Sequence, residues 1–230
     1  QAIAGVLFGI FSSSGQSCIA GSRLFVERSI YDAFVARLVA ATRALTIGHP
    51  FDAATQIAPL IHMDHRDEVA GHVARALEDG AELLCGGKAP EGAAFETGSY
   101  FEPTILAGLP NSARLCREEV FGPVLAVLPF DDEDEVIAAG NDSDYGLACG
   151  IWTRDFPRAW RVGRAINAGT IWHNTYKQFS ISTPFGGERD SGVGREKGRQ
   201  GLRAYMAQKS FYSDLSGAPL PWAGAALEAT

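Results

Sequence analysis

The chain has 230 residues, enough for one sizeable hydrophobic core. Its hydrophobic content of 46%, charged content of 20% and formal net charge of −7 are typical of a soluble globular protein. The sequence has no basic block, which argues against a nucleic-acid partner, and no apolar run of about 18 residues, which argues against a membrane-spanning helix.

The predicted elements alternate between strands and helices along the chain. Strands are predicted at 24–27, 81–85, 101–106, 124–130, 149–153 and 169–172, and helices at 30–45, 65–80 and 156–166. This alternation predicts an α/β fold, in which helices flank a mostly parallel sheet. The nearly continuous apolar run at 124–130 is typical of a buried parallel strand.

Several polar features are interpreted as helix ends rather than binding sites. The acidic run at 131–135 favours a helix N-terminus through the helix dipole, and Gly80 fits a C-terminal cap. His62 and His65 have a spacing that metal ligands can use, but no cysteine or paired acid completes a zinc set. The preferred interpretation is a helix start, and no metal site is predicted.

The two ends of the chain and its cysteines bear on the extent of the whole protein and on its cellular compartment. Residues 207–215 predict one more strand after the core, followed by a loosely held tail to residue 230. The N-terminus has no Met and no basic signal region, so the chain is expected to be part of a larger protein. The cysteines are widely spaced without a CxxC pair, which predicts reduced thiols and a cytoplasmic location.

Cys18 is the first candidate for chemistry. It follows a short polar stretch at 12–17 and precedes the apolar segment 24–26. A cysteine on such a loop can meet solvent and substrate, and backbone N–H groups beside it can stabilise both a thiolate and an oxyanion. Taken alone, the same cysteine would more often be a small buried apolar residue.

Two downstream motifs change that interpretation. They are Glu118–Val124, with the sequence EEVFGPV, and Pro184–Glu196, with the sequence PFGGERDSGVGRE. Together with Gly15–Cys18, in this order, they closely resemble the catalytic half of the aldehyde dehydrogenase superfamily. Shorter matches fall in the expected order at 46–50, 58–61, 145–148 and 169–174.

The resemblance implies a role for each matched residue. Cys18 corresponds to the nucleophile, and its own backbone N–H forms part of the oxyanion site. Glu119 corresponds to the acid that accepts hydrogen bonds from the nicotinamide ribose, and Phe121 to the apolar residue near the nicotinamide ring. Glu196 corresponds to an acid behind the site that helps to relay protons, and a helix-start acid remains the open alternative.

The resemblance also implies a substrate pocket lined by Ser17, Ile19, Asn174, Lys177 and Phe179. For Phe179, a core position is the alternative. Lys177 is the most distinctive of the five, because a cation at this place would favour polar or acidic aldehydes over long alkyl ones.

The implied function is oxidation of an aldehyde to a carboxylic acid with NAD or NADP, through a cysteine thiohemiacetal and a thioester. Family members are about twice as long, and their N-terminal half supplies the cofactor domain, the second oxyanion donor and the general base. Residues 1–206 would form the catalytic domain, and 207–230 the oligomerisation strand and tail of a homo-oligomer. The chain alone is expected to be inactive without that half, in cis or in trans.

Two other functions stay open. In a CoA-acylating relative, a thiol rather than water would take the acyl group, and Glu196 modestly favours water. In a non-catalytic fragment, the strand at 207–215 and the apolar faces would serve assembly alone. A Cys18 no more reactive than Cys85 would favour the fragment.

Overall fold

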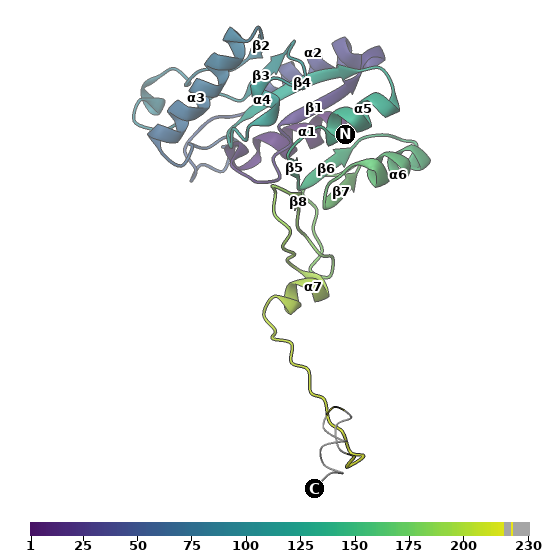
Figure 1. Ribbon diagram of the computed structural model, residues 1–230. Coiled ribbons are helices and arrows are strands. Elements are labelled where there is room, and N and C mark those ends of the chain that lie inside the picture. The colour runs from purple at the N-terminus through teal and green to yellow at the C-terminus, as the bar shows by residue number, and fades with distance from the viewer. Residues whose placement is uncertain (219–221, 223–230) are drawn as a thin grey trace.

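The computed structural model describes residues 1–218 and residue 222 (Figure 1). Its helices are α1 (Ala2–Phe11), α2 (Tyr31–Arg43), α3 (Met63–Glu78), α4 (Arg114–Arg117), α5 (Glu133–Asn141), α6 (Phe156–Ala165) and α7 (Gly198–Arg203), with 3₁₀ turns at Ser12–Gly15, Arg28–Ile30 and Ala93–Phe95. Its strands are β1 (Arg23–Glu27), β2 (Glu82–Cys85), β3 (Thr104–Ala107), β4 (Val124–Phe130), β5 (Tyr145–Gly146), β6 (Ala148–Ile151), β7 (Thr170–His173) and β8 (Glu188–Arg189). No helix in this part of the chain is long and apolar enough to cross a membrane.

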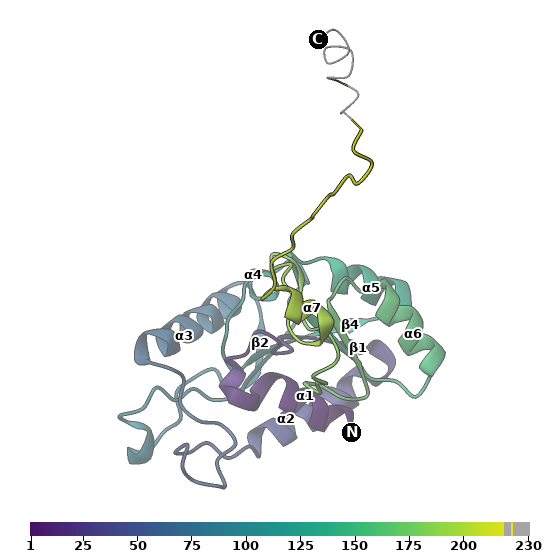
Figure 2. The same cartoon turned by 90° about the horizontal axis from the view of Figure 1, so that it is seen from below.

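The main sheet has the strand order β1-β4-β3-β2. The β1–β4 and β4–β3 pairs are parallel, and β2 joins antiparallel at the edge. Figure 2 shows α1 and α2 on one side of these strands and α4 and α5 on the other. The α/β class with a mostly parallel sheet, as the sequence predicts, is confirmed.

The central strand β4 explains this layering. Val124, Ala126 and Leu128 pack into one apolar cluster with α3 and α4, whereas Leu125 and Val127 pack into the other with α1 and α2. Successive side chains of a strand point to opposite faces, so a strand that is apolar at every position is buried on both faces. The side chains of β4 therefore contribute to both apolar clusters of the core.

Two short strand pairs lie beside the main sheet. β6 pairs with β7 in parallel, and β5 pairs with β8 antiparallel. Neither β6 nor β7 is bonded to β1, so β1 and β6 each keep one strand edge unpaired within the described residues. Both of these edges line one cavity of about 940 Å³.

Most predicted elements are present within a few residues of their predicted bounds. The strand predicted from residue 101 begins only at Thr104, since Pro103 has no N–H to donate to a sheet. The helix α1 was not predicted, because the run from Ala2 to Phe11 is apolar on nearly every side and contains two glycines, and so shows no clear helical stripe.

The strand predicted at 207–215 is not formed within the described residues of the single chain. Residues 204–218 leave the body as an exposed segment without strand pairing (Figure 1). A strand needs a neighbour for its N–H and C=O groups, and residues 1–218 offer none at this place. A role of this segment in oligomerisation stays a prediction.

Candidate active site

Cys18 is exposed on a loop that follows α1, whereas Ser14 and Ile19 of the same loop are buried. The loop begins with a 3₁₀ turn at Ser12–Gly15, in which Ser13 and Ser14 have left-handed φ angles of 57° and 54°. Left-handed residues other than glycine are unfavourable and persist only where surrounding contacts hold them. Among the described residues, the N–H groups of Cys18 and Ile19 have no hydrogen-bond acceptor. The loop therefore presents a thiol together with free N–H donors.

Two side chains fix this loop from within. The hydroxyl of Ser14 donates to the carbonyl of Ala58 at 2.7 Å, and the side-chain oxygen of Gln16 accepts from the N–H of Ile61 at 2.9 Å. Both bonds join the cysteine loop to the Ala58–Ile61 segment, which is far away in sequence. The matched motif at 58–61 thus supports the loop.

A backbone contact sets the position of the loop against a second motif. Gly15 has a φ of +73°, and a Cβ atom at this position would lie 2.1 Å from the carbonyl oxygen of Gly122. Only glycine allows such an approach, because no side chain separates the two backbones. Gly122 follows Phe121, so this contact brings the Cys18 loop beside the segment that carries Glu119.

Glu119 and Phe121 are both exposed and line the same cavity as Cys18. Phe121 has a left-handed φ of 51°, and its carbonyl oxygen lies 2.8 Å from Nε2 of His65 on α3. Ser17 and Ile19 border the cavity as well. Ser17, Cys18, Ile19, Glu119 and Phe121 thus all line this one cavity.

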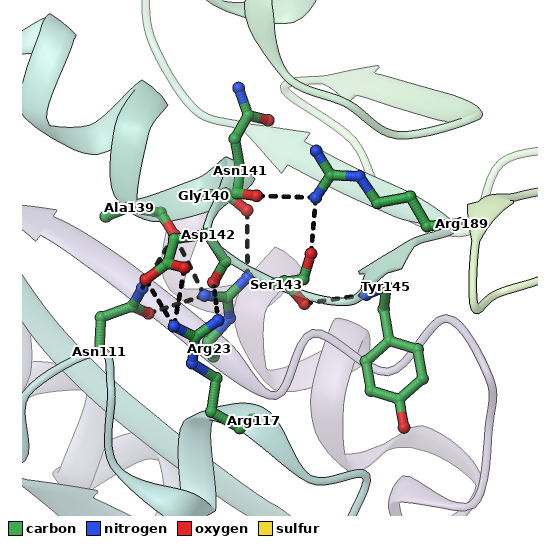
Figure 3. A network of polar contacts seen from close by, with 10 residues as sticks. All are labelled: Arg23, Asn111, Arg117, Ala139, Gly140, Asn141, Asp142, Ser143, Tyr145 and Arg189. Carbon is green, nitrogen blue, oxygen red and sulfur yellow. Dashed lines mark hydrogen bonds and ion pairs between the residues drawn. The ribbon is translucent and has the colours of Figure 1, made fainter.

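Arginine side chains anchor the segment that precedes Glu119 (Figure 3). Arg117 donates two 2.7 Å bonds to the carboxylate of Asp142 and a third, of 2.8 Å, to its carbonyl. Arg23 and Arg189 donate to other carbonyls at the end of α5 and the turn after it. The Arg117 guanidinium lowers the pKa of Asp142, which keeps this carboxylate charged. The network ties the Glu119 segment to α5.

Lys177 approaches the cysteine loop from the other side. Its ammonium donates to the hydroxyl of Ser12 at 2.7 Å and lies 5.7 Å from the ring centroid of Phe8. Its backbone φ is 55°, again left-handed. Burial lowers the pKa of Lys177, and the nearby Cys18 opposes this shift.

Lys177 and the other three predicted site residues, Asn174, Phe179 and Glu196, lie outside the cavity that Cys18 lines. The side-chain amide of Asn174 bonds both the N–H and the carbonyl of Thr153, which makes it a structural link to the end of β6. The ring of Phe179 is exposed and packs edge-on against Trp172 and Phe185. Glu196 is exposed and precedes α7, and its backbone pairs with Phe185.

Sequence reasoning missed Tyr176. Its ring packs against Trp172, with centroids 4.8 Å apart, and fills space that glycines leave open. These glycines are Gly9 on α1, Gly21 after the cysteine loop and Gly150 on β6. Burial raises the pKa of Tyr176, so the phenol stays neutral. A large aromatic residue beside several distant glycines is a packing signal that a single sequence does not reveal.

The other three cysteines differ from Cys18 in burial. Cys85 and Cys116 are buried, and burial raises the pKa of both thiols. Burial also raises the pKa of Cys149 to about 11. Thiols with raised pKa values are poor nucleophiles at neutral pH, so Cys18 is the one exposed candidate among the four.

Known proteins resemble this chain over almost all of its length. The model of the aldehyde dehydrogenase family matches residues 1–211. The betaine aldehyde dehydrogenases of Mesorhizobium japonicum and Brucella melitensis biotype 2 are each 44% identical to the chain over 222 residues, which is 96% of this chain and 46% of each relative. The chain thus spans about half the length of the curated relatives it matches.

Solved structures show the same similarity. Betaine aldehyde dehydrogenase from Staphylococcus aureus, in complex with NAD+, matches with a TM-score of 0.94 and 36% identity, covering 96% of this chain and 44% of that one. An NAD+ complex of an aldehyde dehydrogenase from Bacillus cereus matches with a TM-score of 0.89 and 35% identity, covering 94% of this chain and 43% of that one.

Proposed function

Because the chain belongs to the aldehyde dehydrogenase family, we propose that it carries the nucleophile of an enzyme that oxidises an aldehyde to a carboxylic acid with NAD or NADP. The observation that carries this proposal is the position of Cys18. It is an exposed thiol beside free N–H groups, and it lines one cavity with Glu119 and Phe121.

The proposed chemistry begins at the sulfur. The Cys18 thiolate adds to the aldehyde carbon, and the carbonyl oxygen of the resulting thiohemiacetal carries negative charge, which the Cys18 N–H stabilises. Loss of hydride from this carbon leaves a thioester, and attack by water releases the acid and restores the thiol. Aldehyde, water and the oxidised cofactor thus give acid, reduced cofactor and a proton.

The residues present fit the nicotinamide end of the cofactor. The exposed carboxylate of Glu119 can accept hydrogen bonds from two neighbouring ribose hydroxyls, and the Phe121 ring offers an apolar surface in the same cavity. When bound, the cofactor supplies the hydride acceptor. Solved relatives contain NAD+, which makes NAD the first candidate, although NADP remains open.

The active enzyme is proposed to need further polypeptide, in cis or in trans. The relatives are about twice as long as this chain, which covers only 46% of them. The unpaired edges of β1 and β6 face a common cavity, so one inserted strand could pair with both. In a parallel sheet, a right-handed crossover places the strand before a helix beside the strand after it. The helix α1 comes before β1, with a 3₁₀ turn between them, so a strand that preceded α1 would lie beside β1.

Hydrolysis is proposed as the second half of the reaction. Glu196 is retained as an acid that helps to relay protons, although its exposed side chain lies outside the Cys18 cavity. The alternative is transfer of the acyl group to CoA. Replacing Glu196 with Gln should slow release of the acid while leaving the first burst of reduced cofactor unchanged, and a variant with unaltered steady-state turnover would remove Glu196 from the mechanism.

The substrate pocket is proposed to lie around Ser17, Ile19 and the segment from Asn174 to Phe179. Asn174 would act there through its hold on Thr153 rather than as a free amide. Relatives carry the name betaine aldehyde dehydrogenase, so betaine aldehyde is one candidate substrate. Assembly into a homo-oligomer through 207–215 and a cytoplasmic location remain predictions.

The decisive experiment joins this chain to its N-terminal half and measures aldehyde-dependent formation of reduced cofactor. Cys18→Ser should abolish turnover, whereas Cys85→Ser should retain it, because Cys85 is buried in the core. The 230-residue chain alone should be alkylated at Cys18 but should not oxidise aldehydes. Full turnover by Cys18→Ser would refute the proposal.

A further inference from the structure

The end of α5 is held by three arginine side chains from distant parts of the chain (Figure 3). A helix leaves its last carbonyls without partners inside the helix, and its C-terminus carries a partial negative charge. Arg23 donates to two of these carbonyls at 3.2 Å each, and Arg189 donates to two more, at 2.8 and 2.6 Å, at the last residue of the helix and in the turn after it. The side-chain amide of Asn141 also bonds two backbone groups at the end of α6. The end of α5 is therefore held even without the third arginine, Arg117.

Arg117 joins this fixed helix end to the segment that carries Glu119. It is the last residue of α4, and its guanidinium donates two 2.7 Å bonds to the carboxylate of Asp142 and one 2.8 Å bond to the carbonyl of the same residue. Asn111 donates to the same carboxylate at 3.3 Å. Glu118 follows in an extended conformation, with φ −92° and ψ 147°, and its side chain makes longer ion-pair contacts of 3.6 and 3.8 Å. The Cα atom of Glu119 therefore lies within about 7 Å of the Cα atom of Arg117.

The Glu119 segment itself has few constraints. It lies between α4 and β4 and forms no helix or strand. Within the described part of the chain, no acceptor meets the N–H groups of Glu119 and its next two neighbours. After Glu119, the buried side chain of Val120 and the carbonyl of Phe121, which lies 2.8 Å from Nε2 of His65, hold the segment. Before Glu119, the shortest side-chain contacts are those of Arg117, so its loss would free this end of the segment.

We propose that Arg117 is a positioning residue for Glu119, which it holds in the cavity that Cys18 lines so that the carboxylate can accept the ribose hydroxyls of the cofactor. This inference rests on the proposed function, since Glu119 is the ribose acceptor in that proposal. Arg117, Glu119 and Cys18 all line the cavity. Both Nη atoms of Arg117 already bond Asp142, so the guanidinium acts on the cofactor through Glu119 rather than by direct contact.

The test uses the complete enzyme, in which this chain is joined to its N-terminal half. Isothermal titration calorimetry with NAD+ and NADP+ gives the Kd of the cofactor that the wild type prefers, and initial rates give its KM. Arg117→Met removes the pair, Asp142→Asn removes the charge of its partner, and Arg117→Lys keeps a cation without the second Nη atom. Arg161→Met is the matched control, because Arg161 also makes two bonds to a carboxylate of α5, that of Glu133, at 3.0 Å each.

Arg117→Met and Asp142→Asn should each raise the Kd and the KM of the cofactor tenfold or more, which corresponds to about 1.4 kcal/mol. Arg117→Lys should recover part of the loss, and Arg161→Met should bind as wild type. Alkylation of Cys18 by iodoacetamide without cofactor should keep its rate in all variants, because separate contacts hold its loop. A wild-type Kd in Arg117→Met, or an equal loss in Arg161→Met, would overturn the inference. If Arg117→Met does not fold, Asp142→Asn decides by the same criteria.

A double-mutant cycle separates positioning from a general structural role. In a Glu119→Ala background, Arg117→Met should change the Kd of the cofactor no further, because the carboxylate that it positions is already lost. The same loss with and without Glu119 would mean that Arg117 contacts the cofactor or supports the fold as a whole, and the inference would be wrong. Full turnover by Cys18→Ser, or a wild type that oxidises no aldehyde, would instead overturn the proposed function and this inference with it.

Discussion

The close contact between Gly15 and Gly122 predicts how much stability is lost when Gly15 is replaced with alanine. In Gly15→Ala, the alanine must adopt a φ of +73°, which costs roughly 1–2 kcal/mol for a residue with a side chain. Its Cβ would also lie 2.1 Å from the Gly122 oxygen, so the two backbones must separate. Such overpacking costs about 1–3 kcal/mol. The free energy of unfolding should therefore fall by about 2–5 kcal/mol.

The displaced backbone leads to Cys18, so the reactivity of this thiol should fall together with stability. Moving a reacting group by about 1 Å can lower a rate roughly a hundredfold. Gly80→Ala is the control, because Gly80 has a φ of +96° but nothing within 4 Å of the added Cβ. Urea denaturation gives the stabilities, and iodoacetamide labelling gives the reactivity of Cys18. If Gly15→Ala and Gly80→Ala lose the same stability and Cys18 reacts equally fast in both, the close-approach argument is wrong.

Three other predictions test separate parts of the structure. Iodoacetamide at pH 7.5, about 1 unit below the pKa of a free thiol, should modify Cys18 well before Cys149. The reason is that Cys18 is exposed, whereas burial raises the pKa of Cys149 to about 11. Equal labelling of the two cysteines in peptide mapping would contradict this prediction. Burial lowers the pKa of His72 in the folded chain. Near pH 5–6, on the acidic side of the pKa of a free imidazole, the unfolded chain therefore binds more protons than the folded chain. The free energy of unfolding should then decline from pH 7 toward pH 5. His72→Gln should flatten that decline in urea titrations, and identical slopes would exclude His72 as a cause. Tyr176→Ala should lower the free energy of unfolding by roughly 3 kcal/mol, because it empties the space between three glycines, and a loss below about 1 kcal/mol would show that the site collapses.

The sequence predicts those parts of the fold that depend on local patterns. The apolar run of β4 and the helical stripes of α2 and α3 identify central elements, because burial on one or both faces leaves a periodic trace. The acidic start of α5 is also confirmed, with Asp132 accepting from the N–H of Glu135 as the N-cap. The apolar helix α1 leaves no such trace, since it is buried or covered on most sides.

The sequence identifies the candidate residues of the site, but not the contacts that position them. The residue types of Cys18, Glu119 and Phe121 follow from short motifs, and the cavity places them together. The contacts that position them do not follow from a pattern, because they join segments that are far apart in sequence. Gln16 with Ile61, Gly15 with Gly122 and Lys177 with Ser12 are all contacts of this kind.

At this site, the residues that hold the loop in place differ from the candidate reactive residues in whether they have partners within the chain. The side chains of Ser14 and Gln16 have partners within the chain, and Gly15 packs directly on another backbone. Cys18 and Glu119, by contrast, are exposed in the middle of a tightly held region. Water solvates an exposed thiol or carboxylate, so neither group needs a partner within the fold. Cys18 and Glu119 are therefore free to meet a substrate or a cofactor, whereas Ser14, Gly15 and Gln16 hold the loop in place.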